Sequence, residues 1–331
     1  MSNIFQKLIR PRLPSAAIGL SGESAAAVSL ERRRESIVVR SAGYVTLPED
    51  LVRPNFEESN VADVRELADV LGELVTSAGL AKRHRWSVAL PEAATRTAIL
   101  TMEATASSSA GGEREEMLRW KTERGFGAKL EELRVSRQRL RPDAQGRTRY
   151  LATAVRQTVL AEYEAAFAAL GWHAGLLLPR HMGEAWWLMR DRAVNAAGTD
   201  SLLVSVHREG FTVVLLRRAQ PLFVRSIICD PEDRADELYR FLLFYRDRVT
   251  APTPADESRG TSAAATTGET IAQVLVAGHG IEPQLAVQLV EETLAVAPRL
   301  VSAEDVRLAL PAGDLPFDLV AAPAGLAALA F

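Results

Sequence analysis

The hydrophobic pattern of this chain repeats itself in two places, beginning near Ala17 and near Leu203. In both places an apolar run is followed by a short polar turn, a second apolar run, a charged turn and a third apolar run. Apolar runs broken by such turns are typical of antiparallel hairpins. The pattern predicts a three-stranded meander at the head of each half, in a duplicated α/β architecture with a cleft between the halves. The apolar runs are 17–20, 27–30 and 37–39 in the first copy, and 203–206, 211–216 and 222–224 in the second.

Several segments between and after the meanders have apolar residues at three- and four-residue steps, which is typical of amphipathic helices. The clearest is 60–78, where Gly79 supplies the stop. With the apolar runs, these helices predict mixed sheets flanked by helices in two lobes, 1–200 and 201–331. Residues 86–155 predict an inserted small α/β subdomain in the first lobe. The other expected helices are 113–124, 158–170, 182–190, 231–249 and 283–296; the other expected strands are 86–90, 95–102, 133–140, 148–155, 176–178 and 271–277; and 317–331 is expected to form a final strand and helix.

One segment of the second lobe has little potential to form a core. Residues 250–270 are dominated by Ala, Thr, Ser, Pro and Gly. Such a stretch buries too little apolar surface to offset the entropy lost on ordering. We therefore expect a flexible loop there.

The bulk composition is that of a soluble globular protein, with 47% hydrophobic and 24% charged residues. A formal net charge of -3 gives no support for nucleic-acid binding. The single Cys229 cannot form an internal disulfide, and we expect it to pack as a small hydrophobe. No apolar run approaches the ~20 residues that cross a bilayer. The N-terminal stretch around Lys7 and Arg10 favours a short packed helix over a membrane-surface anchor, and we interpret it as mature cytoplasmic sequence.

Five segments carry a resemblance to a known family, in this order: 18–30; 117–121 with 131–133; 204–216 with 222–225; 274–280; and 324–327. They resemble the first phosphate hairpin, the inserted subdomain, the second phosphate hairpin, the adenosine-contacting turn and the closing helix of type IV pilus assembly proteins of the PilM kind. That family lies within the actin/FtsA-like superfamily. The resemblance covers nearly the whole chain. It implies an actin-like two-lobed fold, in which paired hairpins facing a cleft hold the phosphates of a nucleotide.

At both phosphate hairpins the chain departs from the family's pattern. The family's first carboxylate is Gly19 here, its following glycine is Ser21, and a basic residue further along is Ala26. In the second hairpin the acidic position is Ser205 and the glycine after it is His207. Carboxylates at such places hold magnesium, and glycines let the backbone approach a phosphate closely. Without them, phosphoryl transfer loses the metal positioning and charge neutralisation on which it depends.

The residues that could still contact a nucleotide lie in turns. They are Ser21, Gly22, Ser24, Ser205, His207, Gly278, His279 and Gly280. We expect a vestigial nucleotide cleft with no catalytic residue, no metal site and no required cofactor, while binding of ATP with magnesium stays open. For the two histidines, an ordinary solvated side chain is favoured over a ligand contact. The chain has no Walker-type loop and no Gly-x-Ser-x-Gly motif.

The resemblance therefore implies a scaffold and not an enzyme. Such a protein would be cytoplasmic and peripheral to the inner membrane, held there only through its partner. The implied partner is a PilN-like single-span inner-membrane protein, whose N-terminal cytoplasmic tail would bind between the first meander and the insertion 86–155. Self-association stays open, and no nucleic-acid partner is expected. The alternatives are an active actin-like ATPase or kinase, and the cytoplasmic module of a type II secretion system, which normally continues into a transmembrane helix.

Overall fold

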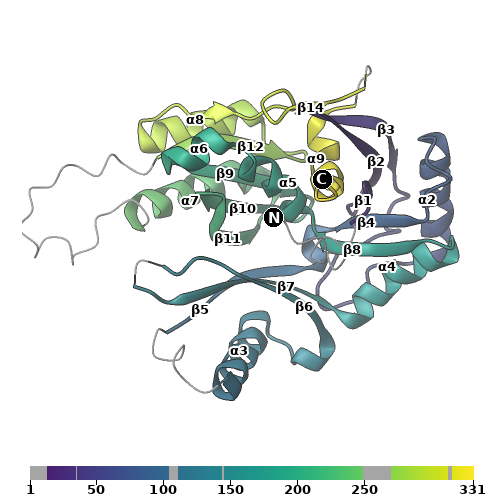
Figure 1. The fold of residues 1–331 in the computed structure, drawn as a ribbon, viewed down its shortest axis with the longest axis horizontal. Helices are drawn as coiled ribbons and strands as arrows, with labels where there is room; N and C mark the ends of the chain where they lie inside the picture. Colours follow the sequence, from purple (N-terminus) through teal and green to yellow (C-terminus); the bar gives the residue numbers. More distant parts are fainter. Residues whose placement is uncertain (1–12, 35, 104–110, 144, 249–269, 312–314) are drawn as a thin grey trace, which may run out of the picture. The chain divides into compact units, whose positions relative to one another are not determined.

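The computed structural model describes residues 13–331 except 35, 104–110, 144, 249–269 and 312–314 (Figure 1). By its internal contacts the chain forms two compact units. Unit 1 comprises residues 1–95, 155–183 and 307–331, and unit 2 comprises residues 96–154 and 184–306. The expected flexible loop 250–270 and the N-terminal stretch lie, almost entirely, outside the described residues.

Unit 1 is built on a six-stranded mixed sheet in the order β14-β3-β2-β1-β4-β8. The predicted first meander forms its antiparallel part, because β1 pairs with β2 and β2 with β3. The other three pairings, β1 with β4, β4 with β8 and β3 with β14, are parallel. The strands are β1 Ala16–Leu20, β2 Ser24–Arg33, β3 Ser36–Thr46, β4 Arg85–Leu90, β8 His173–Pro179 and β14 Leu308–Ala309.

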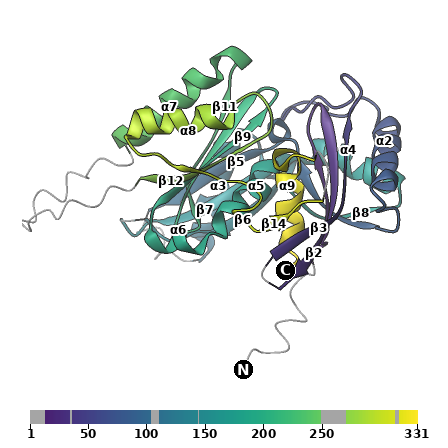
Figure 2. The ribbon, with the colours of Figure 1, turned by 90° about the horizontal axis from the view of Figure 1, so that it is seen from above.

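Helices cover both faces of this sheet (Figure 2). Helix α2, Val64–Ser77, starts at Asp63, whose carboxylate accepts hydrogen bonds from the amides of Arg65 and Glu66. The apolar stripe of α2 is buried, and α4, Gln157–Ala169, packs beside it. On the opposite face, α9, Phe317–Ala328, contacts β1, β2 and β4. A fourth helix, α5 Arg180–Met189, continues from unit 1 into unit 2.

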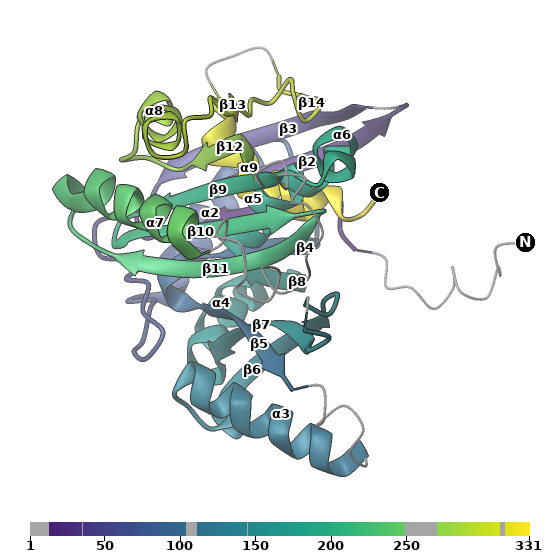
Figure 3. The ribbon, with the colours of Figure 1, turned by 90° about the vertical axis from the view of Figure 1, so that its left-hand side faces the viewer.

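Unit 2 repeats the same arrangement in a five-stranded sheet, in the order β11-β10-β9-β12-β13. The second meander is antiparallel, and the next two strands add in parallel, as in unit 1. The predicted duplication is therefore confirmed. Helices α7 and α8 lie side by side over this sheet (Figure 3). The elements are β9 Asp200–His207, β10 Gly210–Arg217, β11 Gln220–Ile228, β12 Ile271–Ala277, β13 Arg299–Leu300, α6 Arg192–Ala197, α7 Arg234–Arg248 and α8 Pro283–Leu294.

The insertion is a three-stranded sheet in the order β5-β7-β6, packed against one helix. It starts at Arg96 and not at Trp86, because the strand that contains Trp86 is β4 of the unit 1 sheet. The guanidinium of Arg149 donates to the carbonyl oxygens of Pro221 and Leu222 on β11, which groups the insertion with unit 2. The elements are β5 Arg96–Met102, α3 Gly111–Phe126, β6 Leu133–Arg139 and β7 Thr148–Arg156.

The C-terminal segment differs from expectation in two ways. Residues 317–331 were expected to form a strand and a helix in the second lobe, whereas one helix, α9, packs on the unit 1 sheet. The helix is apolar on nearly every side, and almost all of its residues are buried. An apolar run without a polar face does not reveal from sequence whether it is helix or strand, or which sheet it covers.

Candidate functional site

The eight residues predicted to line a vestigial nucleotide site fall into two groups. Three of them, Ser21, Gly22 and Ser24, form the β1–β2 turn of unit 1, and the other five lie in unit 2.

The polar groups of the first turn are largely satisfied by one another. The hydroxyl of Ser21 accepts the amide of Ser24 at 2.9 Å and lies 2.9 Å from its hydroxyl. The amides of Ser21 and Glu23 also bond within the turn, to the carbonyl of Ser24 and the hydroxyl of Ser21. A Cβ on Gly22 would lie 3.1 Å from the ring of Pro54. A phosphate would therefore have to replace existing hydrogen bonds to bind these groups.

The position of the missing carboxylate, Gly19, is filled by another part of unit 1. A Cβ placed on Gly19 would lie 2.9 Å from Cδ and 3.1 Å from Cγ of Pro323 on α9. Contacts below 3.0 Å require one of the two groups to shift. The space that a longer side chain would need is therefore occupied by the proline ring, and the backbones of β1 and α9 approach closely because residue 19 is glycine.

In unit 2, the structure brings Ser205, His207, Gly278 and Gly280 together at the ends of two parallel strands. Ser205 on β9 is paired with Ala277 at the end of β12, and the turn 278–280 follows directly. The Ser205 side chain is buried, and its hydroxyl has no hydrogen-bond partner among the described residues. His279, at the middle of the turn, is exposed. Four of the five predicted residues thus form one cluster.

Arg234, at the start of α7, completes this cluster. Its Nη2 donates to the carbonyl oxygens of His207 and Arg208, both at 2.9 Å, and the residue is buried. Its Nη1 lies 1.8 Å from the place where a Cβ of Gly280 would be, so only glycine fits at that position, where φ is +109°. The guanidinium therefore hydrogen-bonds the β9–β10 turn and packs against the turn after β12.

His207 also has a hydrogen-bonding partner on its own hairpin. Its Nδ1 lies 3.1 Å from the carboxylate of Glu209. Burial acts to raise the pKa of Glu209, but the hydrogen bond to His207 and the positive charges nearby outweigh it, so that the pKa lies below its ordinary value. This pair stabilises the β9–β10 turn. The expectation that His207 is an ordinary solvated side chain is wrong, because the ring is largely buried and paired with Glu209.

Three further observations concern metal binding, thiol chemistry and membrane spans in the described part of the chain. Among the described residues, no three His, Cys, Asp or Glu side chains are grouped to hold a metal ion. Burial raises the pKa of the half-buried Cys229 thiol, which disfavours the reactive thiolate. In the described residues, no helix is long and apolar enough to span a bilayer.

The comparisons with known proteins rest on structure. No family model matches the chain, and no curated protein matches it. The PilM–PilN type IV pilus biogenesis complex is similar with a TM-score of 0.71 and 18% identity, over 97% of this chain and 99% of that chain. The chain has an actin-like fold. This confirms the fold class that the two meanders and the resemblance predicted.

Two further solved structures are more distant. A protein with an actin-like ATPase fold from Bacteroides thetaiotaomicron gives a TM-score of 0.44 and 10% identity, over 97% of this chain and 98% of that chain. The cytoplasmic domain of EpsL, an inner-membrane component of the type II secretion system of Vibrio cholerae, gives a TM-score of 0.45 and 12% identity, over 95% of this chain and 93% of that chain.

Proposed function

We propose that this actin-like protein is a cytoplasmic scaffold of a type IV pilus inner-membrane complex, which binds the N-terminal cytoplasmic tail of a PilN-like single-span membrane protein. The observation that carries the proposal is the likeness to the PilM–PilN complex over nearly the full length of both chains. Association with the inner membrane through this partner is part of the same proposal.

We also propose that the nucleotide site is degenerate. Three features of the described residues support this: the self-satisfied Ser21–Ser24 turn, the contact of Gly19 with Pro323, and the guanidinium of Arg234 against Gly280. None of the three depends on how the two units sit relative to each other. The competing function is an active ATPase or kinase of the same fold, using variant residues.

A thermal unfolding experiment separates these two functions. A nucleotide present at about 100 times its dissociation constant stabilises the folded state by ~2.7 kcal/mol, which raises the melting temperature by several degrees. For the degenerate site we expect the melting temperature to stay unchanged in millimolar ATP with magnesium. A clear rise, together with ATP turnover, would favour the enzyme.

The insertion offers a side chain suited to contact a protein partner. Trp120 on α3 is 53% exposed, with the guanidinium of Arg124 5.2 Å from its ring centre. It lines a shallow hollow of about 440 Å³ that extends to Gly127 and Glu132. Exposed tryptophans beside polar rims are enriched among the residues that dominate protein–protein binding. We therefore place part of the partner surface on this face of α3.

Replacing Trp120 with alanine is expected to weaken binding of the partner's tail about 30-fold, because hot-spot aromatics contribute about 2 kcal/mol or more. The measurement is fluorescence polarisation with a labelled peptide that carries the N-terminal cytoplasmic tail of the proposed PilN-like partner. Tyr239→Ala is the matched control, since Tyr239 on α7 is a similarly exposed aromatic at 41%. Equal affinities for both variants would contradict the placement on α3, and absence of any tail binding would contradict the proposed function.

A further inference from the structure

One edge of the unit 1 sheet gathers exposed basic side chains from separate parts of the sequence. At this edge β1, β3, β4, β8 and β14 begin and β2 ends, as the strand registers show. The end of β2 and the turn to β3 carry three consecutive arginines, the loop before β4 carries a lysine and an arginine, and another arginine precedes β14. The six residues are Arg32, Arg33, Arg34, Lys82, Arg83 and Arg307, and all are exposed.

Hydrogen bonds confirm that these segments meet at the same edge. The backbone amide of Ile37 donates to the carbonyl of Arg307 at 3.0 Å. The guanidinium of Arg83 lies 3.4 Å from the hydroxyl of Ser29, which is paired with the first residue of β1. The guanidinium of Arg32 donates to the backbone oxygen of Phe331, which follows α9 in the sequence. The basic groups are therefore neighbours in the folded unit, although they are separated by up to 275 positions in the chain.

Few carboxylates neutralise this edge. In the described parts of its segments, 29–34, 36, 79–84 and 302–307, the carboxylates are Glu31, Glu304 and Asp305. Glu31 lies 3.6 Å from Nε of Arg33, and Asp305 is paired with Arg299. Glu35 follows Arg34 in the sequence and lies outside the described residues. Six basic groups thus face a small number of acids, so the edge carries a local positive charge on a chain whose net charge is -3.

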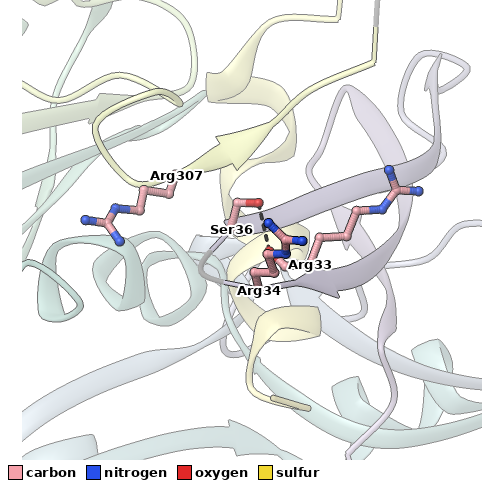
Figure 4. A pocket seen from close by; sticks show the side chains of 4 residues that line it. All are labelled: Arg33, Arg34, Ser36 and Arg307. Carbon is pink, nitrogen blue, oxygen red and sulfur yellow. Dashed lines mark hydrogen bonds between the residues drawn. The ribbon is translucent and has the colours of Figure 1, made fainter.

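The arginines do not converge on one point. Arg33, Arg34, Ser36 and Arg307 line a shallow hollow of about 840 Å³, and the guanidinium of Arg307 points away from that of Arg33 (Figure 4). From the β4 end to β14 the basic row spans four strand spacings, roughly 20 Å at about 4.8 Å each. A single phosphate accepts hydrogen bonds at about 3 Å and could meet only a few of these groups. A row of this width fits a surface that carries many anions.

We propose that this basic edge binds the anionic headgroups of a phospholipid bilayer, so that the protein contacts the membrane directly as well as through its partner. The choice of a lipid surface over nucleic acid rests on the proposed function, which places the chain beneath the inner membrane. Clusters of Lys and Arg bind anionic leaflets through the surface potential, and each residue contributes about fivefold in affinity. The attraction is screened by salt within about 10 Å at 0.1 M.

The test uses the full chain and vesicles of phosphatidylcholine, with or without phosphatidylglycerol, in a sedimentation assay. We expect binding only to the anionic vesicles, and loss of binding as salt rises. The triple variant Arg33→Gln, Arg34→Gln, Lys82→Gln should bind on the order of 100-fold more weakly, since three charges are removed. The matched control is Arg114→Gln, Arg134→Gln, Arg139→Gln, which removes three exposed charges from the insertion. It should keep its affinity within about threefold.

Several results would overturn the proposal. These are no binding to anionic vesicles, equal losses in both triple variants, or tighter binding of duplex DNA than of vesicles. Lys7, Arg10 and Arg12 precede this edge in the sequence. A Lys7→Gln, Arg10→Gln, Arg12→Gln variant that abolishes binding, while the edge variant keeps it, would also count against the edge. Binding of the tail peptide is measured without lipid, so failure of lipid binding is distinguishable from failure of the scaffold function.

Discussion

Replacing Gly19 with aspartate is expected to lower the free energy of unfolding by more than about 4 kcal/mol. The Cβ alone would lie 2.9 Å from Pro323, and overpacking of this kind costs about 1–3 kcal/mol. The carboxylate would add the cost of burying a charge, because residue 19 lies in a fully buried strand. Urea unfolding followed by circular dichroism measures the loss, and Gly19→Ala should show only the smaller, steric part.

Gly112→Asp is a suitable control for this substitution. Gly112 is exposed near the start of α3, where a Cβ would meet nothing within 4 Å, and a carboxylate in the first turn of a helix is favourable. We expect a change within about 0.5 kcal/mol. A second variant, Gly19→Asp with Pro323→Ala, should recover part of the loss. If Gly19→Asp is as stable as the parent, the ring of Pro323 does not exclude a side chain at residue 19, and this support for a degenerate site is lost.

Much of the architecture could be predicted from the sequence, because most of its helices and strands follow from local patterns. The two meanders, α2 and most other helices follow from apolar periodicity and stop signals. The β2–β3 hairpin is longer than the sequence pattern predicts. The charged residues 31–33, expected in a turn, belong to β2. Their side chains lie where the hairpin extends past β1, so no apolar alternation marks them as strand. The two-residue strands β13 and β14 are too short to show any pattern.

The candidate site was harder to predict because its decisive contacts join distant residues. Gly19 and Pro323 meet across almost the whole chain, and Arg234 reaches both the β9–β10 turn and Gly280. Two weak signals were present in the sequence. A proline inside an apolar helix is costly, and an arginine in the first turn of a helix opposes the helix dipole. A proline or an arginine at such a position indicates that a tertiary contact offsets the local cost. The sequence does not say which residue makes that contact.

A buried ion pair at the base of the second meander is expected to make the other large contribution to stability. Asp200 begins β9 and is fully buried. Its carboxylate accepts both Nε and Nη2 of Arg217, at 2.6 and 2.8 Å, and the hydroxyl of Tyr245 at 2.8 Å. Removing one partner of a buried pair leaves the other charge uncompensated, which costs about 3–5 kcal/mol. We therefore expect Asp200→Ala to lower the free energy of unfolding by about that amount in urea unfolding.

The matched control for this pair is Asp247→Ala on α7, whose carboxylate lies 3.0 Å from Arg246 with 61% of its side chain exposed. Exposed pairs contribute little, so its loss should stay within about 0.5 kcal/mol. Tyr245→Phe removes only one hydrogen bond to the same carboxylate and should cost about 1–3 kcal/mol. When it is combined with Asp200→Ala, Tyr245→Phe should lower the free energy of unfolding by much less than it does alone, because the carboxylate that accepts its hydrogen bond is already gone. Equal small losses for Asp200→Ala and Asp247→Ala would show that this pair does not hold β9 to β10.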